Sequence, residues 1–394
     1  MTRIGKRRGG LAGLLLRSDG AVSVLVVVLG FLCGTILVAL VGRNPLNMYK
    51  AILQSLTGYN IDRGIWNIRY VGEWLNLSVP YIFCGLAMAF AARTGLFNIG
   101  GEGQYIMGLT MAQVVALLGP QAPVLHWVLA MAAALLMGAI WGGIVGFLKA
   151  RYEVSEVVAT IMLNYVALYL SRIITMAIPG TNTYKTVNFP QTASLRTEFL
   201  STLTNGSTLN LGIFLVIASV VLYWFLMERT NLGFGLRATG FNKEAARYGG
   251  IPVVASVVIS MAVAGAFAGM GGGVVALGSF RHGRVLSGMD GYGFTGIAVA
   301  LVGNNTAVGT LLAGLLFGLL AAAQPLMQSR QIPKEIALII QGLIVVFIAV
   351  RSGIRLFLRW RLKGATGKTR LSQGQGEEKA AAGQQLEEKE ETYE

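Results

Sequence analysis

Long apolar runs separated by short polar segments make up most of the chain between residues 21 and 350. Because a helix rises 1.5 Å per residue, about 20 apolar residues cross the hydrocarbon core of a bilayer. The pattern therefore predicts an all-α, polytopic membrane bundle of about ten transmembrane helices. The predicted spans are Ala21–Val41, Leu75–Ala92, Ile99–Leu118, Leu125–Leu148, Val157–Ile178, Leu211–Met227, Val253–Gly273, Gly291–Val302, Val308–Ala323 and Ile336–Val350.

Two of these runs differ from an ordinary membrane span. Ala21–Val41 has the basic flank of a signal peptide, but its length of roughly 20 residues favours a retained span. Gly291–Val302 has only about a dozen residues and is too short to cross a bilayer by itself. We expect it to form a discontinuous span together with part of the polar segment before it.

Two glycine-rich polar segments interrupt the apolar pattern. Gly95–Gln104 carries an amide and a carboxylate between two spans, and Ser287–Gly296 has a similar character. In hydrocarbon, unpaired polar groups cost several kcal/mol, so irregular backbone persists only inside protein or along a water-filled path. These segments therefore indicate a path for a transported solute.

The positions of the two segments predict an inverted repeat. Five spans precede the polar loop Pro179–Asn210 and five follow it, so the halves have opposite orientations. Each glycine-rich segment leads into the third span of its half. Such paired interruptions are a sequence sign of a translocation path.

Composition supports lipid as the main solvent. Hydrophobic residues make up 54% of the 394 residues and charged residues only 13%, about half the share of soluble domains. The mean hydropathy is +0.62. No shift in composition marks a second globular domain, so we expect one transmembrane domain over residues 21–350.

The net charge of +14 is concentrated beside the spans. Basic clusters in residues 1–20 and 351–370 favour a cytoplasmic location for both termini. The final residues 373–394 are poor in apolar groups and end acidic, which predicts disorder in a cytoplasmic tail. Since these clusters flank spans and lack interleaved aromatics, a nucleic-acid partner is not expected. The loop Gly42–Gly72 contains four basic residues and is an exception to the positive-inside rule.

The sequence offers no catalytic or metal-binding constellation. Cys33 and Cys84 both lie in apolar runs, and only two histidines are present. Lys368 follows a glycine as in a phosphate-binding loop, but Leu362 replaces the first glycine of that motif. We therefore expect no cofactor, no metal and no enzymatic activity in this chain.

Polar residues in the spans are candidates for the path. The intramembrane carboxylate Glu102 has two interpretations: it contacts solute, or Asn98, Gln104 and glycine amides hold it to fix a broken helix. Asp290 carries the same ambiguity, with nearby basic residues as partners. The candidate path residues are Phe97, Asn98, Glu102, Gln104, Asn164 and Asp290.

The polar stretch 228–251 between the sixth and seventh spans predicts a short cytoplasmic helix. Asn242 is a good N-cap, Lys243–Tyr248 can form the helix, and Gly249 and Gly250 can end it. This element is either a solvated loop or a docking element for a soluble partner.

Three motifs in this order resemble permease subunits of bacterial ABC importers. They are Gly95–Gln104, Gly233–Ile251 and Gly293–Asn305. The chain is similar to the ribose/branched-chain amino-acid permease superfamily, in particular its nucleoside (guanosine-type) branch, over most of Leu75–Val350.

The resemblance implies a multi-pass subunit of the bacterial plasma (cytoplasmic, inner) membrane. This subunit would form half of the path for a nucleoside or similar small polar solute. The implied partners are ABC ATPase subunits, a second and paralogous permease, a substrate-binding lipoprotein and membrane lipid. The stretch 228–251 would be the coupling element, and its candidate ATPase-coupling residues are Arg237, Asn242, Lys243, Glu244 and Arg247.

Two alternatives remain open from the sequence. One is an ion-coupled secondary transporter of a small polar solute, which would need a chain of membrane carboxylates. The other is an ABC importer for a sugar or a branched-chain amino acid.

Overall fold

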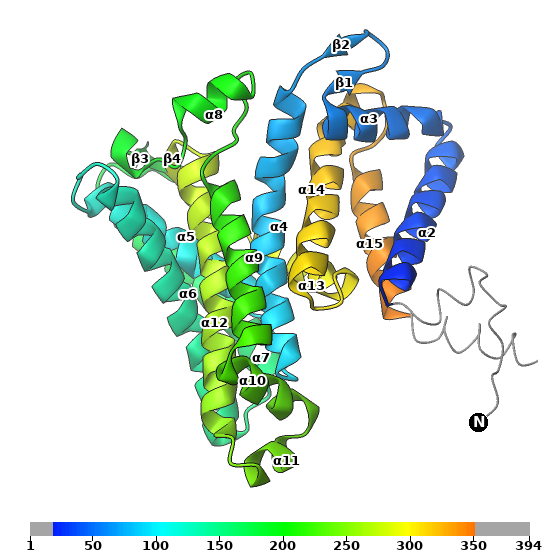
Figure 1. The fold of residues 1–394 in the computed structure, drawn as a ribbon. Helices are drawn as coiled ribbons and strands as arrows, with labels where there is room; N and C mark the ends of the chain where they lie inside the picture. The colour runs from blue at the N-terminus through cyan, green and yellow to red at the C-terminus, as the bar shows by residue number, and fades with distance from the viewer. Residues whose placement is uncertain (1–18, 351–394) are drawn as a thin grey trace, which may run out of the picture. The chain divides into compact units, whose positions relative to one another are not determined.

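The computed structural model describes residues 19–350, and the predicted basic N-terminus and acidic tail lie outside this range except for residues 19 and 20. Within it, seven helices are long and apolar enough to cross a membrane. The fold is therefore an all-α, polytopic membrane bundle (Figure 1). These seven helices are α2 (Asp19–Leu40), α4 (Arg69–Arg93), α6 (Leu125–Tyr152), α7 (Glu156–Met176), α9 (Gly212–Arg229), α12 (Val253–Val274) and α14 (Ala307–Ser329).

The three remaining predicted runs are also helical. They form α5 (Gly101–Leu118), α13 (Tyr292–Val302) and α15 (Glu335–Ala349). With 11 residues, α13 is about 16 Å long and spans only part of a bilayer. The crossing of all ten helices and the inversion of the halves stay predictions.

Contacts divide the chain into two units. The larger is Leu29–Val345, and the described residues of the smaller are 19–28 and 346–350. All contacts described below lie within the larger unit.

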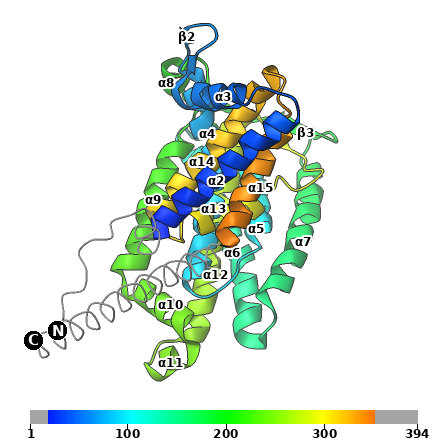
Figure 2. The same ribbon diagram turned by 90° about the vertical axis from the view of Figure 1, so that its right-hand side faces the viewer.

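One end of the bundle carries the longer connections (Figures 1 and 2). We call it the α3 end, after α3 (Pro45–Thr57). It also holds the hairpin β1 (Tyr59–Asn60)–β2 (Ile65–Trp66), the antiparallel pair β3 (Lys185–Asn188)–β4 (His282–Arg284), the turn η1 (Gln191–Ala193) and the short helix α8 (Glu198–Leu203). The opposite end, which we call the α11 end, holds α10 (Asn231–Phe241) and α11 (Lys243–Tyr248).

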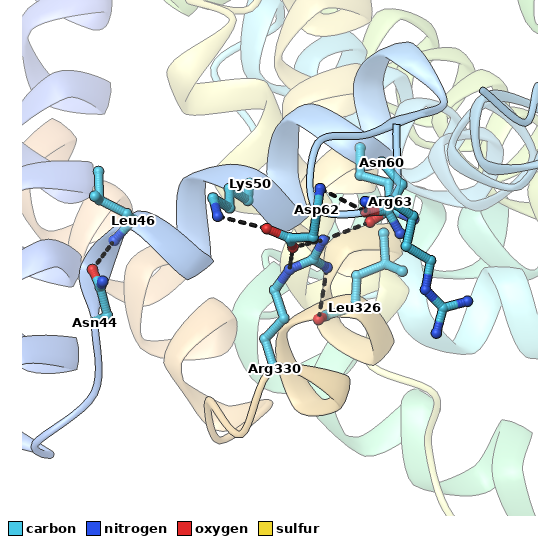
Figure 3. Close-up of polar contacts among 9 residues, drawn as sticks. Asn44, Leu46, Lys50, Asn60, Asp62, Arg63, Leu326 and Arg330 are labelled. Atoms are coloured by element: carbon cyan, nitrogen blue, oxygen red, sulfur yellow. Dashed lines mark hydrogen bonds and ion pairs between the residues drawn. The ribbon is translucent and has the colours of Figure 1, made fainter. Parts of the chain in front are cut away.

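A charged cluster fixes the β1–β2 turn at the α3 end (Figure 3). Lys50 of α3 contacts the Asp62 carboxylate at 2.5 Å, and Arg330, just after α14, contacts it at 3.1 Å. Asp62 thus neutralises part of the positive charge that makes this loop an exception to the positive-inside rule. The cluster joins α3, the hairpin and the end of α14.

Polar contacts also order the long loop between α7 and α9. Arg196 donates hydrogen bonds to the backbone oxygens of Gly278 and Ser279, which belong to the π-helical turn η2 (Val275–Ser279) that extends α12. The Asn210 amide donates to Asn76 of α4 at 2.8 Å. The loop is therefore attached to two of the long helices.

Small residues bring the central helices together. Among the seven long helices α4 is the most buried: 78% of its 18-residue apolar window lies inside the protein. A Cβ atom on Gly265 of α12 would lie 2.9 Å from the Gly138 carbonyl carbon of α6, so these backbones touch. Phe90, Tyr223 and Phe267 pack as an aromatic cluster among α4, α9 and α12. The two glycine-rich segments lie beside this closely packed centre.

Candidate functional site

The segment between α4 and α5 is a sharp, internally bonded bend. Gly95 has φ +73°, a conformation that glycine adopts without strain. The side-chain amides of Asn98 and Gln104 bond reciprocally at 2.9 and 3.1 Å, and the Asn98 oxygen also accepts the Gly100 N–H. Both amides are buried. They pair with each other, so the expectation that they hold Glu102 is wrong.

Asn164 of α7 fastens the first turn of α5. Its side-chain oxygen accepts the Gly103 N–H at 2.7 Å, and its NH₂ group donates to the Ile99 oxygen at 3.1 Å. A Cβ atom on Gly103 would lie 2.8 Å from that side-chain oxygen, so this approach requires glycine. Asn164 is buried and holds α7 against the bend.

Glu102 joins the two glycine-rich segments. Its carboxylate oxygens accept the backbone N–H groups of Gly291 and Gly293 at 2.7 and 2.6 Å, and its side chain is fully buried. These N–H groups lie at the N-terminus of α13, where helical backbone lacks internal acceptors and favours an anion. The glycine amides around Glu102 therefore come from the second half of the chain and not from its own segment.

Asp290 forms an ion pair one residue before this contact. Arg284 of β4 binds its carboxylate bidentately at 2.7 and 2.8 Å, and the Tyr105 hydroxyl donates to it at 3.2 Å. The Arg284 backbone N–H in turn donates to the side chain of Gln113 in α5. Of the basic residues near Asp290 in sequence, Arg284 is thus its partner.

Aromatic side chains are the accessible groups at this site. Phe97, within the bend, and Phe294, in the first turn of α13, are both exposed. The sequence predicts Phe97 as a path residue, but it does not identify Phe294, Tyr105 or Arg284 as part of the path. Five of the six predicted path residues are polar, and all five are bonded within the protein. Phe97 is the one left exposed.

The coupling candidates separate into two groups at the α11 end. Arg237 of α10 binds the Glu228 carboxylate at 3.0 Å and also the Met227 oxygen, while Arg93 of α4 binds Glu228 at 2.6 Å. Arg237 therefore stabilises the junction between α9 and α10. It does not lie with the other candidates at the tip of the bundle, the name used here for residues 240–250, which comprise the end of α10 and α11.

The tip itself has the predicted helix. The Asn242 side chain accepts the Ala245 N–H at 3.0 Å as N-cap of α11, and the Gly249 N–H closes its end on the Ala245 oxygen at 2.9 Å. Both boundaries predicted from the sequence are confirmed. Lys243, Glu244 and Arg247 are exposed on this helix, with Arg247 and Glu244 3.7 Å apart.

A recess of about 270 Å³ adjoins the tip. Lys149, Lys243 and Arg247 contribute positive charge to its lining, and Glu153 contributes negative charge. The tip thus presents charged groups of both signs around a shallow depression.

The tip and the bend are in direct contact through two glycines. A Cβ atom on Gly240, near the end of α10, would lie 3.0 Å from the Gly95 nitrogen and 2.5 Å from the Arg93 oxygen. The backbone of α10 therefore lies against the start of the bend. This contact connects the two candidate sites.

Comparison with known proteins gives concordant matches. The sequence profile of the family described as "branched-chain amino acid transport system / permease component" matches residues 70–349. The guanosine ABC transporter permease NupP of Bacillus subtilis is 39% identical over 87% of this chain and 97% of its own length. The nucleoside ABC transporter permease NupB of Lactococcus lactis is 36% identical over 86% of this chain and 92% of its own.

A third relative has another named substrate. It is a glucose ABC transporter permease of Haloferax volcanii, 33% identical over 74% of this chain and 78% of its own. Bacillus subtilis and Lactococcus lactis each have a second permease, named for the same substrate as the first, that also matches this chain.

Proposed function

This chain belongs to the permease-component family of branched-chain amino acid transport systems, and we propose that it forms half of the path of an ATP-driven nucleoside importer. As a member it is a transport subunit and not an enzyme, and it is a multi-pass protein of the plasma membrane. The observation that carries the proposed substrate is the similarity to two nucleoside permeases over 86–87% of the chain.

The proposed path passes the bend and the N-terminus of α13. The buried polar residues Asn98, Glu102, Gln104 and Asn164, together with Asp290, hold its shape because their bonds are already made within the protein. The exposed rings of Phe97 and Phe294 are available to a passing solute. Aromatic rings stack favourably on flat apolar surfaces, a property that suits a nucleobase.

A second permease completes the proposed path. Only 22% of the 18-residue apolar window of α7 is buried, the lowest share among the seven long helices. Its uncovered residues include Tyr165, Tyr169 and the ionisable Arg172. Ionisable residues within spans rarely face lipid, which supports a protein neighbour along this helix. The paired permeases of the two related bacteria support a paralogue in this role.

The proposed topology has ten membrane helices in two inverted halves. The first half is α2, α4, α5, α6 and α7, and the second is α9, α12, α13, α14 and α15. In this arrangement both termini and the α11 end are cytoplasmic, as the distribution of basic residues favours. The ATPase subunit binds the tip around α11, a substrate-binding lipoprotein delivers solute at the α3 end, and lipid surrounds the rest.

The contacts of the carboxylates disfavour an ion-coupled carrier. Such a carrier would use membrane carboxylates that bind and release ions. Here both oxygens of Glu102 accept backbone N–H groups, and Asp290 is paired with Arg284. An importer for a sugar or a branched-chain amino acid remains the alternative within the family.

Uptake measurements test the proposal. The permease is expressed with its proposed partners, the ATPase, the second permease and the lipoprotein, in a bacterium that lacks nucleoside uptake. We expect accumulation of labelled guanosine that is not displaced by excess glucose or leucine. We also expect accumulation to stop on ATP depletion while the ion gradients are clamped. Uptake that survives ATP depletion, or that glucose or leucine displaces, contradicts the proposal.

A further inference from the structure

Three aromatic residues recur every seven positions at the α11 end: Phe234, Phe241 and Tyr248. Phe241 is 91% exposed and Tyr248 is 92% exposed. Among residues 19–350 these are the most exposed of the large hydrophobic side chains. Nearly full exposure of two large aromatic groups, one at the end of α10 and one at the end of α11, leaves apolar surface that a binding partner would cover.

The two helices hold the backbone of both aromatic residues in place. The opposite face of α10 is buried through Gly233, Leu236 and Thr239, so Phe241 cannot turn inward without unpacking the helix. Helix α11 is closed at both ends, and the Ile251 N–H returns to the Ala246 oxygen at 3.0 Å. The aromatic pair is therefore presented by a preformed element, which lowers the entropic cost of binding.

The position and charge of the tip favour a protein partner over lipid. Helix α11 follows α9 and α10 in the chain and precedes α12, and it lies at one extremity of the bundle (Figure 1). Glu244 on α11 and Glu153 in the adjoining recess place negative charge beside the basic residues, which disfavours an anionic lipid surface. Aromatic anchors surrounded by charged residues are typical of the centres of protein interfaces.

We propose that Phe241 and Tyr248 are the apolar anchors by which this permease binds its ATPase subunit. Both rings insert into an apolar groove of the ATPase, and Lys243 and Arg247 face an acidic rim of that groove. This inference rests on the proposed function and identifies the anchoring residues, which are not the charged residues expected from the sequence.

The test measures binding of the purified partner ATPase to the full-length permease complex in nanodiscs. The variant is Phe241→Ser combined with Tyr248→Ser. The matched control is Tyr184→Ser combined with Phe199→Ser, which removes two strongly exposed aromatics at the α3 end. Size-exclusion profiles and melting temperatures of all proteins should agree, because none of these side chains is packed.

We expect the first variant to bind the ATPase at least tenfold more weakly and the control to bind like the wild type. The conservative variant Phe241→Tyr combined with Tyr248→Phe should retain wild-type affinity. If the affinity of the double serine variant for the ATPase is within twofold of the wild-type affinity, the inference is wrong and the proposed function is unaffected. If the wild-type complex itself does not bind the ATPase, the proposed function fails first.

Discussion

The carboxylate of Glu102 accepts the backbone N–H of Gly293 at 2.6 Å, although the two residues are 191 positions apart. The second carboxylate oxygen accepts the Gly291 N–H. One side chain of the first glycine-rich segment thus supplies the acceptors that the N-terminus of α13 lacks. A short helix that starts inside a membrane protein needs such partners, because no bulk water is available to its first N–H groups.

This contact predicts that Glu102 acts on stability before it acts on solute. Glu102→Ala leaves two buried N–H groups without acceptors, and each lost bond to a charged group costs about 1.5–3 kcal/mol. Glu102→Gln keeps one acceptor and should be milder. We expect melting temperatures in detergent to fall in the order wild type, Gln, Ala. A variant with an unchanged melting temperature and a raised KM for uptake would instead indicate solute contact.

Gly293 should not accept a methyl group. A Cβ atom there would lie 2.6 Å from the Gly101 carbonyl carbon and closer still to the Glu102 backbone. Overpacking of this kind costs about 1–3 kcal/mol, so Gly293→Ala should lower the melting temperature and uptake. Gly288→Ala is the matched control, since nothing lies within 4 Å of its Cβ position. Equal behaviour of the two variants would contradict the close contact between the segments.

The sequence predicts the helices well because their length and apolarity follow from the membrane itself. Each of the ten apolar runs is a helix, and the Asn242 cap and the Gly249 end of α11 are local signals that the structure confirms. Pairings between distant segments could not be predicted this way. The pairing of β3 with β4 and the π-helical end of α12 depend on contacts that no local pattern encodes.

For the candidate site, the sequence identifies residue types and not their partners. Glu102 is singled out because a carboxylate in an apolar stretch is costly, but its acceptor role toward α13 depends on the fold. Sequence position alone groups Arg237 with the other coupling candidates, but its ion pair with Glu228 places it at the junction of α9 and α10. The seven-residue spacing of Phe234, Phe241 and Tyr248 is present in the sequence, but it indicates a binding surface only once the structure shows that these side chains are exposed.

The charged cluster at the α3 end predicts a pH dependence. The hydrogen bond from Lys50 lowers the pKa of Asp62 below its ordinary value of 3.8, and Arg330 lowers it further. A carboxylate with a lowered pKa contributes stability above its unfolded pKa and loses it as pH falls through the folded value. Asp62→Asn should therefore melt below the wild type at pH 7, and the difference should vanish well below pH 3.8. A difference that persists there would exclude the ion pairs as its cause.

Labelling of intact cells tests the proposed topology. In a background with Cys33 and Cys84 replaced by alanine, Tyr184→Cys places an exposed thiol at the α3 end and Glu244→Cys places one on α11. A membrane-impermeant maleimide should modify Tyr184→Cys in intact cells, and Glu244→Cys only after permeabilisation. The opposite labelling pattern would show that the protein has the inverse orientation in the membrane, with the tip out of reach of a cytoplasmic ATPase.

The contact between Gly240 and the bend predicts a variant that binds the ATPase but transports poorly. Gly240→Ala would place a methyl group 2.5 Å from the Arg93 oxygen and 2.9 Å from the Thr94 carbonyl carbon, which forces α10 away from the bend. The hydrogen bonds that cap α11 do not involve Gly240, and the Phe241 ring stays exposed at the end of α10, so binding of the ATPase should be retained.

Uptake should nevertheless fall several-fold in Gly240→Ala, because movement of the tip no longer reaches the backbone at Gly95 directly. Gly235→Ala on the same helix is the control. Its Cβ position has only an ordinary contact of 3.4 Å with Ile251, so binding and uptake should both match the wild type. Normal uptake by Gly240→Ala would show that motion reaches the path by another route. If ATPase binding and uptake are both lost, the substitution distorts the tip itself. If uptake is lost and binding is retained, the result supports transmission through the two glycines.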